Sequence, residues 1–161
     1  MKKIIIALLT GAMMLSLAGC SNDYAIEPAD SESSTYSTFN GMSALEYSLF
    51  AGKQLAVVAN QLNGRIVTVS AQKGVSRQSE EEETEFAIKK VEDAKNLFKT
   101  TRPAKTYEEQ RELTLKTLER VENHLKDYQK DLKEENNVDK YTDIFSSDFN
   151  EVTNLSNLYQ E

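Results

Sequence analysis

The sequence predicts an all-α protein, an antiparallel up-down-up-down four-helix bundle that covers residues 42–161. Two observations support this prediction. Apolar residues recur at steps of three and four through four successive segments, which is the spacing of one face of an α-helix. The connections between these segments are short, and short connections favour antiparallel neighbours in a bundle. About 120 residues is an ordinary size for a single hydrophobic core.

The first 19 residues have the composition of an export signal rather than of the bundle. Lys2 and Lys3 precede an apolar stretch from Ile4 to Leu17, which is shorter than the ~20 residues that a transmembrane helix needs. A basic start, a short apolar run and an exit of small residues are typical of a cleaved signal peptide. We therefore expect residues 1–19 to be removed.

The segment Leu17-Ala18-Gly19-Cys20 resembles the lipobox of bacterial lipoproteins, and the resemblance covers about the first 20 residues. It implies cleavage between Gly19 and Cys20, a diacylglycerol on the thiol, and Cys20 as the new N-terminus. Two acyl chains are enough for stable anchoring. The predicted location is therefore a cell membrane, on the side that faces away from the cytoplasm.

Two other roles of Cys20 can be weighed against lipidation. A disulfide within the chain is excluded because Cys20 is the only cysteine. A catalytic thiol needs a base and an electropositive pocket, and an apolar signal segment offers neither. The sequence therefore favours lipidation.

The charge of the chain bears on its partners. It has 19 basic and 26 acidic residues, a net charge of −7, and loss of Lys2 and Lys3 with the signal changes this to −9. An anionic membrane surface repels such a chain, and nucleic-acid binding needs clustered Lys and Arg. We therefore predict attachment through the lipid and no nucleic-acid partner.

Residues 20–41 are predicted to be a lipidated cysteine followed by a flexible linker. This segment is rich in Ser, Thr, Asp and Glu, contains Pro28 and has no sustained periodicity, so it cannot bury enough apolar surface to become ordered. As a coil it would span roughly 25 Å.

The first helix is predicted over about residues 43–73, with Gly74 as its stop. Gly64 and the β-branched run at 66–69 lower the helix propensity of its second half, but a lone strand there would have no partner. Its predicted apolar stripe consists of Leu45, Leu49, Ala56, Ala59, Leu62, Ile66 and Val69.

Capping patterns place the starts of the other three helices. Ser79 and Glu82 form a capping box for the second helix, Thr106 and Glu109 for the third, and Asn137 precedes the fourth. The predicted apolar stripe of the second helix is Ala87, Ile88, Val91, Ala94, Leu97 and Phe98. That of the third is Leu118, Val121, Leu125, Tyr128 and Leu132. That of the fourth is Val138, Tyr141, Phe145, Phe149, Val152, Leu155 and Tyr159.

Candidate chemistry is sparse. His124 is the only histidine, whereas a ferritin-like di-iron bundle needs two Glu-x-x-His motifs, so a structural or surface role is favoured. Asp139, Asp143, Asp148 and Glu151 lack the alternate spacing and glycine of a calcium loop. The run at residues 80–83 is interpreted as a solvated helix start. We predict no catalytic residue, no metal site and no cofactor.

The first helix has an unusual charge pattern. Between Glu46 and Glu80 there is no acidic residue, while Lys53, Arg65, Lys73 and Arg77 are present. One interpretation is that small residues let this helix approach its neighbours closely within the bundle. The other is that a weakly charged face meets a partner, because charged residues are depleted at interface cores. Charge substitution at Gln54 or Asn63 would separate them.

These features favour a non-enzymatic, membrane-anchored lipoprotein whose bundle binds another protein of the cell envelope. An alternative is a receptor that captures a small ligand or peptide, as an immunity or transport accessory protein would. A third is self-association through the heptad of the third helix. A homo-oligomer is left open and is not indicated by the pattern.

Overall fold

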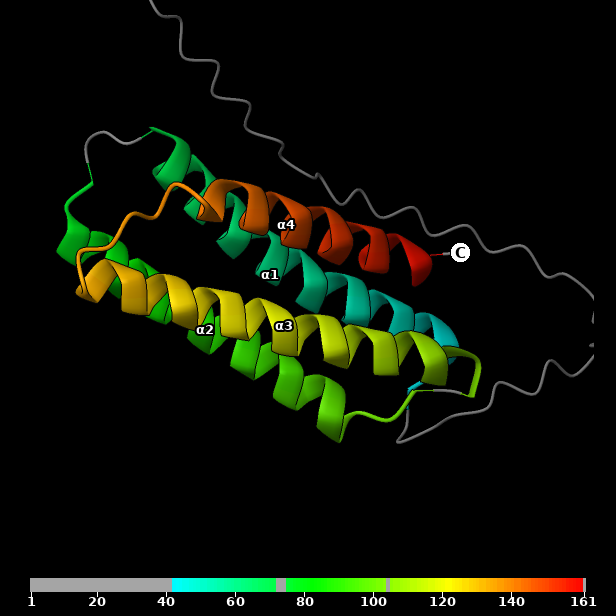
Figure 1. Ribbon diagram of the computed structural model, residues 1–161. Helices are drawn as coiled ribbons and strands as arrows, with labels where there is room; N and C mark the ends of the chain where they lie inside the picture. The colour runs from blue at the N-terminus through cyan, green and yellow to red at the C-terminus, as the bar shows by residue number, and fades with distance from the viewer. Residues whose placement is uncertain (1–41, 72–74, 104, 161) are drawn as a thin grey trace, which may run out of the picture. The chain divides into compact units, whose positions relative to one another are not determined.

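The computed structural model describes residues 42–71, 75–103 and 105–160, all of which belong to one compact unit. Its elements are α1 (Ala44–Ala71), α2 (Arg77–Thr100), the 3₁₀ turn η1 (Lys105–Tyr107), α3 (Glu108–Lys133) and α4 (Tyr141–Leu158). No strand occurs in these ranges, and the four long helices pack as a bundle (Figure 1). The predicted all-α class and helical bundle are therefore confirmed.

Several predictions fall on residues outside these ranges. They include the signal peptide, its cleavage at Gly19, the lipidation of Cys20, the linker, and the helix stop at Gly74. Within the ranges, no helix combines the length and the hydropathy that crossing a bilayer requires.

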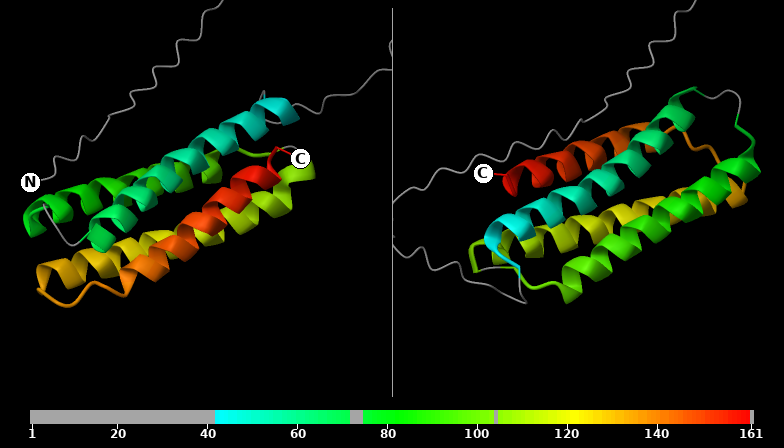
Figure 2. Two further views of the ribbon diagram at one scale, coloured as in Figure 1. Left: turned by 90° about the horizontal axis from the view of Figure 1, so that it is seen from above. Right: turned by 180° about the vertical axis from the view of Figure 1, so that it is seen from behind.

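The helices pack in two close pairs. The contact of α1 with α4 is the most extensive, followed by that of α2 with α3. Figure 2 shows α1 and α4 side by side when the bundle is seen from behind. The start of α1 lies beside the end of α4, where the Ser48 hydroxyl donates a hydrogen bond to the carbonyl of Tyr159. Near the end of α1, Arg65 pairs with Glu80 at the start of α2.

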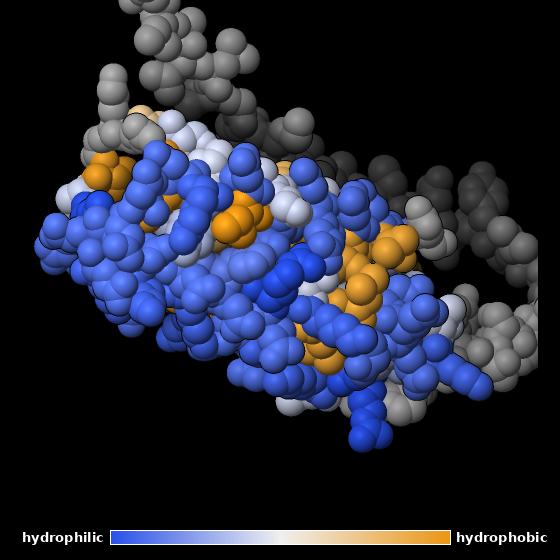
Figure 3. Space-filling view, viewed as in Figure 1, coloured by the Kyte–Doolittle hydropathy of each residue, from blue (hydrophilic) through white to orange (hydrophobic). Residues whose placement is uncertain are grey.

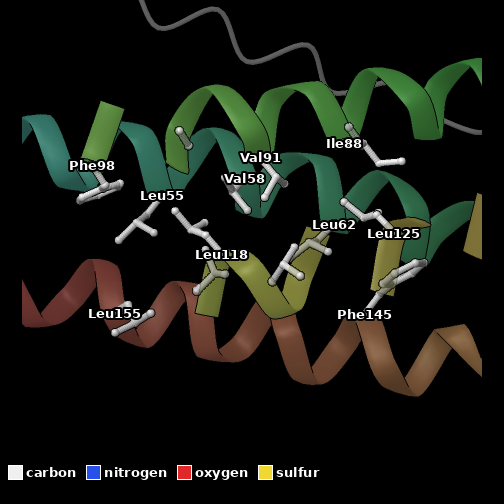
Figure 4. Packing of buried hydrophobic residues seen from close by; sticks show 14 of the residues in the cluster. Leu55, Val58, Leu62, Ile88, Val91, Phe98, Leu118, Leu125, Phe145 and Leu155 are labelled. Atoms are coloured by element: carbon white, nitrogen blue, oxygen red, sulfur yellow. The ribbon is translucent and has the colours of Figure 1, made fainter. Parts of the chain in front are cut away.

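The core has an aliphatic middle and an aromatic cluster at each end. Leucine and valine side chains from several helices meet in the middle (Figure 4). One cluster joins Tyr47, Phe50, Phe98, Tyr107 and Tyr159, with ring centroids 5.5–6.2 Å apart. The other joins Tyr128, Tyr141 and Phe145 at 4.9–5.5 Å. Rings at these separations attract each other beyond simple burial.

The core stripe predicted for α1 is partly wrong. Leu62 and Val69 are buried as predicted and Ala59 and Ile66 are half-buried, but Leu45 and Leu49 are 68% and 66% exposed, and Ala56 is exposed too. The buried stripe is Tyr47, Ala51, Leu55, Val58, Leu62, Arg65 and Val69. Apolar residues occur on two faces of α1, and the aromatic partners of Tyr47 favour the face that turns inward.

Most other stripe residues are buried as predicted. The five predicted residues of α3 are at most 4% exposed, so its heptad seam is covered by the chain's own helices. In α2, Leu97 is 40% exposed, because it lies one position before the buried Phe98 and outside the inner face. Of the stripe predicted for the fourth helix, Phe149 in α4 and Val138, which precedes α4, are half-buried against the core.

The predicted caps are wrong in detail. Ser76, not Ser79, caps α2, and its hydroxyl accepts the Ser79 amide at 3.1 Å. Thr106 lies within η1, which leads directly into α3 without a side-chain cap. Asn137 accepts the Asp139 amide at 2.8 Å, and α4 begins only at Tyr141.

Candidate functional site

The exposed side of α1 is weakly charged. We call it the outer face of α1; its residues are Leu45, Leu49, Lys53, Ala56, Asn60, Asn63 and Val67. Val67 is 59% exposed, so apolar side chains lie at both ends of the face. After Glu46, the charged residues of α1 are Lys53 and Arg65, and Arg65 is buried. From Leu49 to Val67 this face carries one charge, Lys53, with the exposed Glu46 beside its start, and so long a weakly charged face is unusual for a helix in water.

The adjoining side of α4 continues this surface. Asp148 and Glu151 point toward α3, where they pair with Arg120. By the 100° step of a helix, the opposite side of α4 turns toward α1. It carries half-buried or exposed uncharged residues, which we call the α4 flank: Thr142, Ser146, Asn150, Thr153, Ser156 and Asn157. The outer face of α1 and the α4 flank together form the α1–α4 wall.

A shallow hollow of about 460 Å³ lies at one end of this wall. It is lined by Leu45, Ser48, Leu49, Gly52, Lys53 and Gln160. A side chain at Gly52 would meet the Ser156 hydroxyl at 3.8 Å, an ordinary contact distance. The small residue therefore deepens the surface between two exposed leucines rather than relieving a clash.

Helices α2 and α3 are far more highly charged than α1. Charged residues make up 12 of the 24 positions of α2 and 13 of the 26 positions of α3. Figure 3 shows the face that α3 presents, which is mostly hydrophilic with isolated apolar patches. Ion pairs link these helices, as between Lys95 and Glu122 and between Lys126 and Glu92 at 3.2 Å. The bundle therefore has one heavily charged side and one weakly charged wall.

A buried ion pair joins α1 to α2. The Nε of Arg65 lies 3.0 Å from Oε1 of Glu80, and the Tyr128 hydroxyl donates to the same oxygen at 3.1 Å. Burial raises the pKa of the Glu80 carboxyl, although Arg65 and Tyr128 pull it down. Burial also raises the pKa of Tyr128. The interpretation of residues 80–83 as a solvated start is wrong for Glu80, which is 3% exposed.

A second polar cluster joins α3 to α4. Asp148 is 1% exposed and lies 2.7 Å from Nδ1 of His124 and 3.3 Å from Nε of Arg120. Nη2 of Arg120 lies 2.6 Å from Oε2 of Glu151, and the Thr117 hydroxyl donates a hydrogen bond to Oε1 of Glu151 at 2.8 Å. The hydrogen bond from Arg120 lowers the pKa of Glu151 against the opposing effect of its burial. The buried carboxylate of Asp148 thus has Arg120 and His124 as partners, and a buried charge requires such partners.

The four acidic residues that were compared with a calcium loop do not come together. Asp148 and Glu151 serve the cluster with Arg120, while Asp139 and Asp143 are exposed. Over residues 42–71, 75–103 and 105–160, no group of three or more His, Cys, Asp or Glu side chains is placed to hold a metal ion.

Hollows elsewhere on the bundle are open to solvent. One of about 710 Å³ lies between α2 and α3, where Glu85, Glu92, Lys89 and Lys126 are among its mixed charges. A smaller one, of about 230 Å³, lies beside Glu80 and Tyr128, and this volume is below the range usual for ligand pockets. Neither brings a convergent set of unpaired polar groups to one point.

Sequence reasoning identified the charge pattern of the first helix but misplaced its leucines. The absence of acidic residues was the signal that pointed to this helix. What it missed was that Leu45 and Leu49 belong to the exposed face, because the choice between two apolar faces depends on packing.

Comparison with known proteins adds no assignment. No protein-family model matches the chain, and no curated protein or solved structure is significantly similar to it.

Proposed function

We propose that this chain is an exported lipoprotein, held on a membrane through Cys20, whose helical bundle is a non-enzymatic binding module of the cell envelope. The anchoring part rests on the basic start, the short apolar run and Leu17-Ala18-Gly19-Cys20. The helices are proposed to run up-down-up-down. The contacts of Ser48 with Tyr159 and of Arg65 with Glu80 support that order.

The observation that carries the binding role is the α1–α4 wall. A protein interface excludes water from its centre, where charged residues are depleted and apolar ones enriched. The wall offers Leu45, Leu49 and Val67 among uncharged amides and hydroxyls. Elsewhere α2 and α3 present charges at half of their positions, and such surfaces are expensive to desolvate.

The receptor alternative depends on a chamber between the helices. The hollow between α2 and α3, the one beside Glu80 and the one beside Leu45 all open at the surface. They give no specific support to capture of a small ligand within the bundle, and the binding-module proposal is therefore preferred.

Anchoring is tested by Cys20→Ala in cells and, separately, by globomycin, which inhibits the lipoprotein signal peptidase. Both treatments should leave an uncleaved precursor, and the variant should incorporate no labelled fatty acid. The expected readouts are a slower-migrating band and loss of the label. Normal maturation under either treatment would contradict the lipoprotein proposal.

The binding surface is tested with photo-crosslinking residues in native membranes. A crosslinker at Asn63 on the wall should give a discrete adduct, and the matched crosslinker at the exposed Asn96 on α2 should not. Identification of the adduct by mass spectrometry and its loss in an Ala56→Glu variant complete the test. Equal adducts from both positions would rule out the wall as the interface.

A further inference from the structure

We propose that the α1–α4 wall binds the same wall of a second copy of this chain, with the outer faces of the two α1 helices antiparallel across a two-fold axis at Ala56. The inference rests on the proposed function and names the partner on the wall. It uses three features of α1: its charge, the order of its exposed residues, and its extent.

Charge is the first feature. The mature chain is expected to carry a net charge of −9, so two copies repel over most of their surfaces. Acidic residues outnumber basic ones in α2, α3 and α4, whereas α1 has Glu46 against Lys53 and Arg65. The wall is therefore the side on which a second acidic copy meets the least repulsion.

The order of the exposed residues gives the direction of pairing. Counted from Ala56, the exposed apolar residues Leu45 and Val67 lie 11 positions away on either side, and Leu49 and Asn63 lie seven positions away. An antiparallel pair centred on Ala56 therefore places Leu45 opposite Val67 and Leu49 opposite Asn63. A parallel pair would place Lys53 opposite Lys53 and Glu46 opposite Glu46, and like charges facing each other are destabilising.

Small residues at the centre allow close approach. Ala56 lies at the proposed axis, with Gly52 and Ala59 on the adjoining side of the helix. In the antiparallel pair Lys53 comes opposite Ala59, one position from Asn60, whose side-chain carbonyl can accept its hydrogen bond. Each copy thus brings its own donors and acceptors, as a two-fold interface requires.

The extent of the wall matches that of a stable interface. The 28 residues of α1 span about 42 Å, and α1 and α4 together are about 20 Å wide at the usual spacing of packed helices. The wall therefore offers on the order of 800 Å² per copy, the area that each partner of a standard protein interface buries. Confinement of anchored copies to one membrane surface would raise their effective concentration further.

Cysteine crosslinking tests this arrangement in the full chain. In a Cys20→Ala background an introduced cysteine is the only thiol, because the chain has no other. Ala56→Cys should form a disulfide-linked dimer on mild oxidation, at least tenfold more than Asn96→Cys on α2. Leu45→Cys and Val67→Cys should link poorly with themselves and efficiently with each other when the two variants are mixed.

Contrary results are equally definite. Crosslinking of Ala56→Cys at the level of Asn96→Cys overturns the second-copy proposal. Stronger linking of Leu45→Cys with itself than with Val67→Cys overturns the antiparallel arrangement. Adding Ala56→Glu, which sets like charges against each other at the axis, should reduce the linking of Leu45→Cys with Val67→Cys at least tenfold, with helix content by circular dichroism unchanged; undiminished linking also overturns the proposal.

The two proposals fail independently. Crosslinking is measured on the purified, unacylated chain, so it reports the α1 surface whether or not Cys20 is a lipid anchor in cells. Normal maturation of Cys20→Ala would remove the anchor and leave the dimer result unaffected. An Asn63 adduct to a different protein, together with no linking of Ala56→Cys, would support the binding module and contradict the second copy.

Discussion

At the scale of single residues, the two polar clusters show why charges lie inside this bundle. Arg65 and Glu80 are both less than 10% exposed, and Tyr128 donates to the same carboxylate. A buried pair is often no more stabilising than apolar residues of similar volume, yet loss of one partner leaves an uncompensated charge. The pair therefore favours one arrangement of α1 against α2 more than it adds to stability.

Loss of one member of this pair should be costly and loss of both much less so. We expect Arg65→Met to lower the free energy of unfolding by about 3–5 kcal/mol, because Glu80 remains buried without its partner. The double variant with Glu80→Met should recover most of that loss. Urea unfolding followed by circular dichroism measures both.

Glu83 provides the control for that experiment. Its side chain is 59% exposed and lies 3.9 Å from Arg65. Glu83→Gln should change the free energy of unfolding by less than about 0.5 kcal/mol, as is usual for exposed pairs. An Arg65→Met effect as small as that of Glu83→Gln would show that the buried pair does not hold α1 to α2.

At the scale of elements, α1 shows what periodicity can and cannot decide. The helix itself was predictable, including its continuation through Gly64 and the β-branched run, because no partner for a strand exists. Its orientation was misjudged, because the predicted stripe grouped Leu45 and Leu49 with Leu62 and Val69, which lie on another face of the helix. The inward face is held by contacts such as those of Tyr47 with Tyr107 and Tyr159, and those rings are distant in sequence.

The other elements were predicted according to how local their signals are. The seam of α3 from Leu118 to Leu132 was predicted correctly, because a regular apolar stripe runs along that part of the helix. The caps were misplaced because serines occur at both 76 and 79, and the choice depends on backbone geometry. Neither Asp148 with His124 nor Arg65 with Glu80 could be paired from sequence, since each pair joins two helices.

Leucine truncation in α1 tests its orientation. Leu45→Ala and Leu49→Ala should each change the free energy of unfolding by less than about 0.5 kcal/mol, because both side chains are exposed. Leu55→Ala and Leu62→Ala should each lower it by about 2–5 kcal/mol, since both are fully buried. Chemical unfolding of the four matched variants, at a concentration where the chain is monomeric, decides the matter. Equal losses at Leu45 and Leu55 would contradict the observed orientation.

At the scale of the whole molecule, the carboxylates set the response to acid. Burial raises the pKa of Glu122, but hydrogen bonds from Lys126 and Lys95 outweigh it and lower the pKa overall. The hydrogen bond from Arg120 lowers that of Glu151, and those from Lys140 and Asn136 lower that of Asp131. A carboxylate with a lowered pKa stabilises the fold above its unfolded pKa and loses that contribution as the pH falls.

The bundle should therefore lose stability as the pH falls below about 4.5, near the unfolded pKa of Glu. Glu122→Gln should lower the free energy of unfolding at pH 7 by about 1–3 kcal/mol and flatten its dependence on pH, so that variant and wild type converge as the pH falls through the lowered pKa of Glu122. Glu119→Gln, at an exposed position of the same helix, is the matched control. Parallel curves for Glu122→Gln and wild type would contradict this account.

The two-sided distribution of charge also determines how the molecule responds to ionic strength. Salt screens the exposed pairs that link α2 to α3, such as Lys126 with Glu92. The same salt weakens the repulsion between two acidic copies, and kosmotropic anions strengthen burial of apolar surface. A rise in salt concentration thus weakens the exposed ion pairs between α2 and α3 and favours contact between two copies through the α1–α4 wall. If the two-fold contact forms, a larger share of the chain should therefore be dimeric in concentrated salt and a smaller share in dilute buffer, which sedimentation at two ionic strengths would measure.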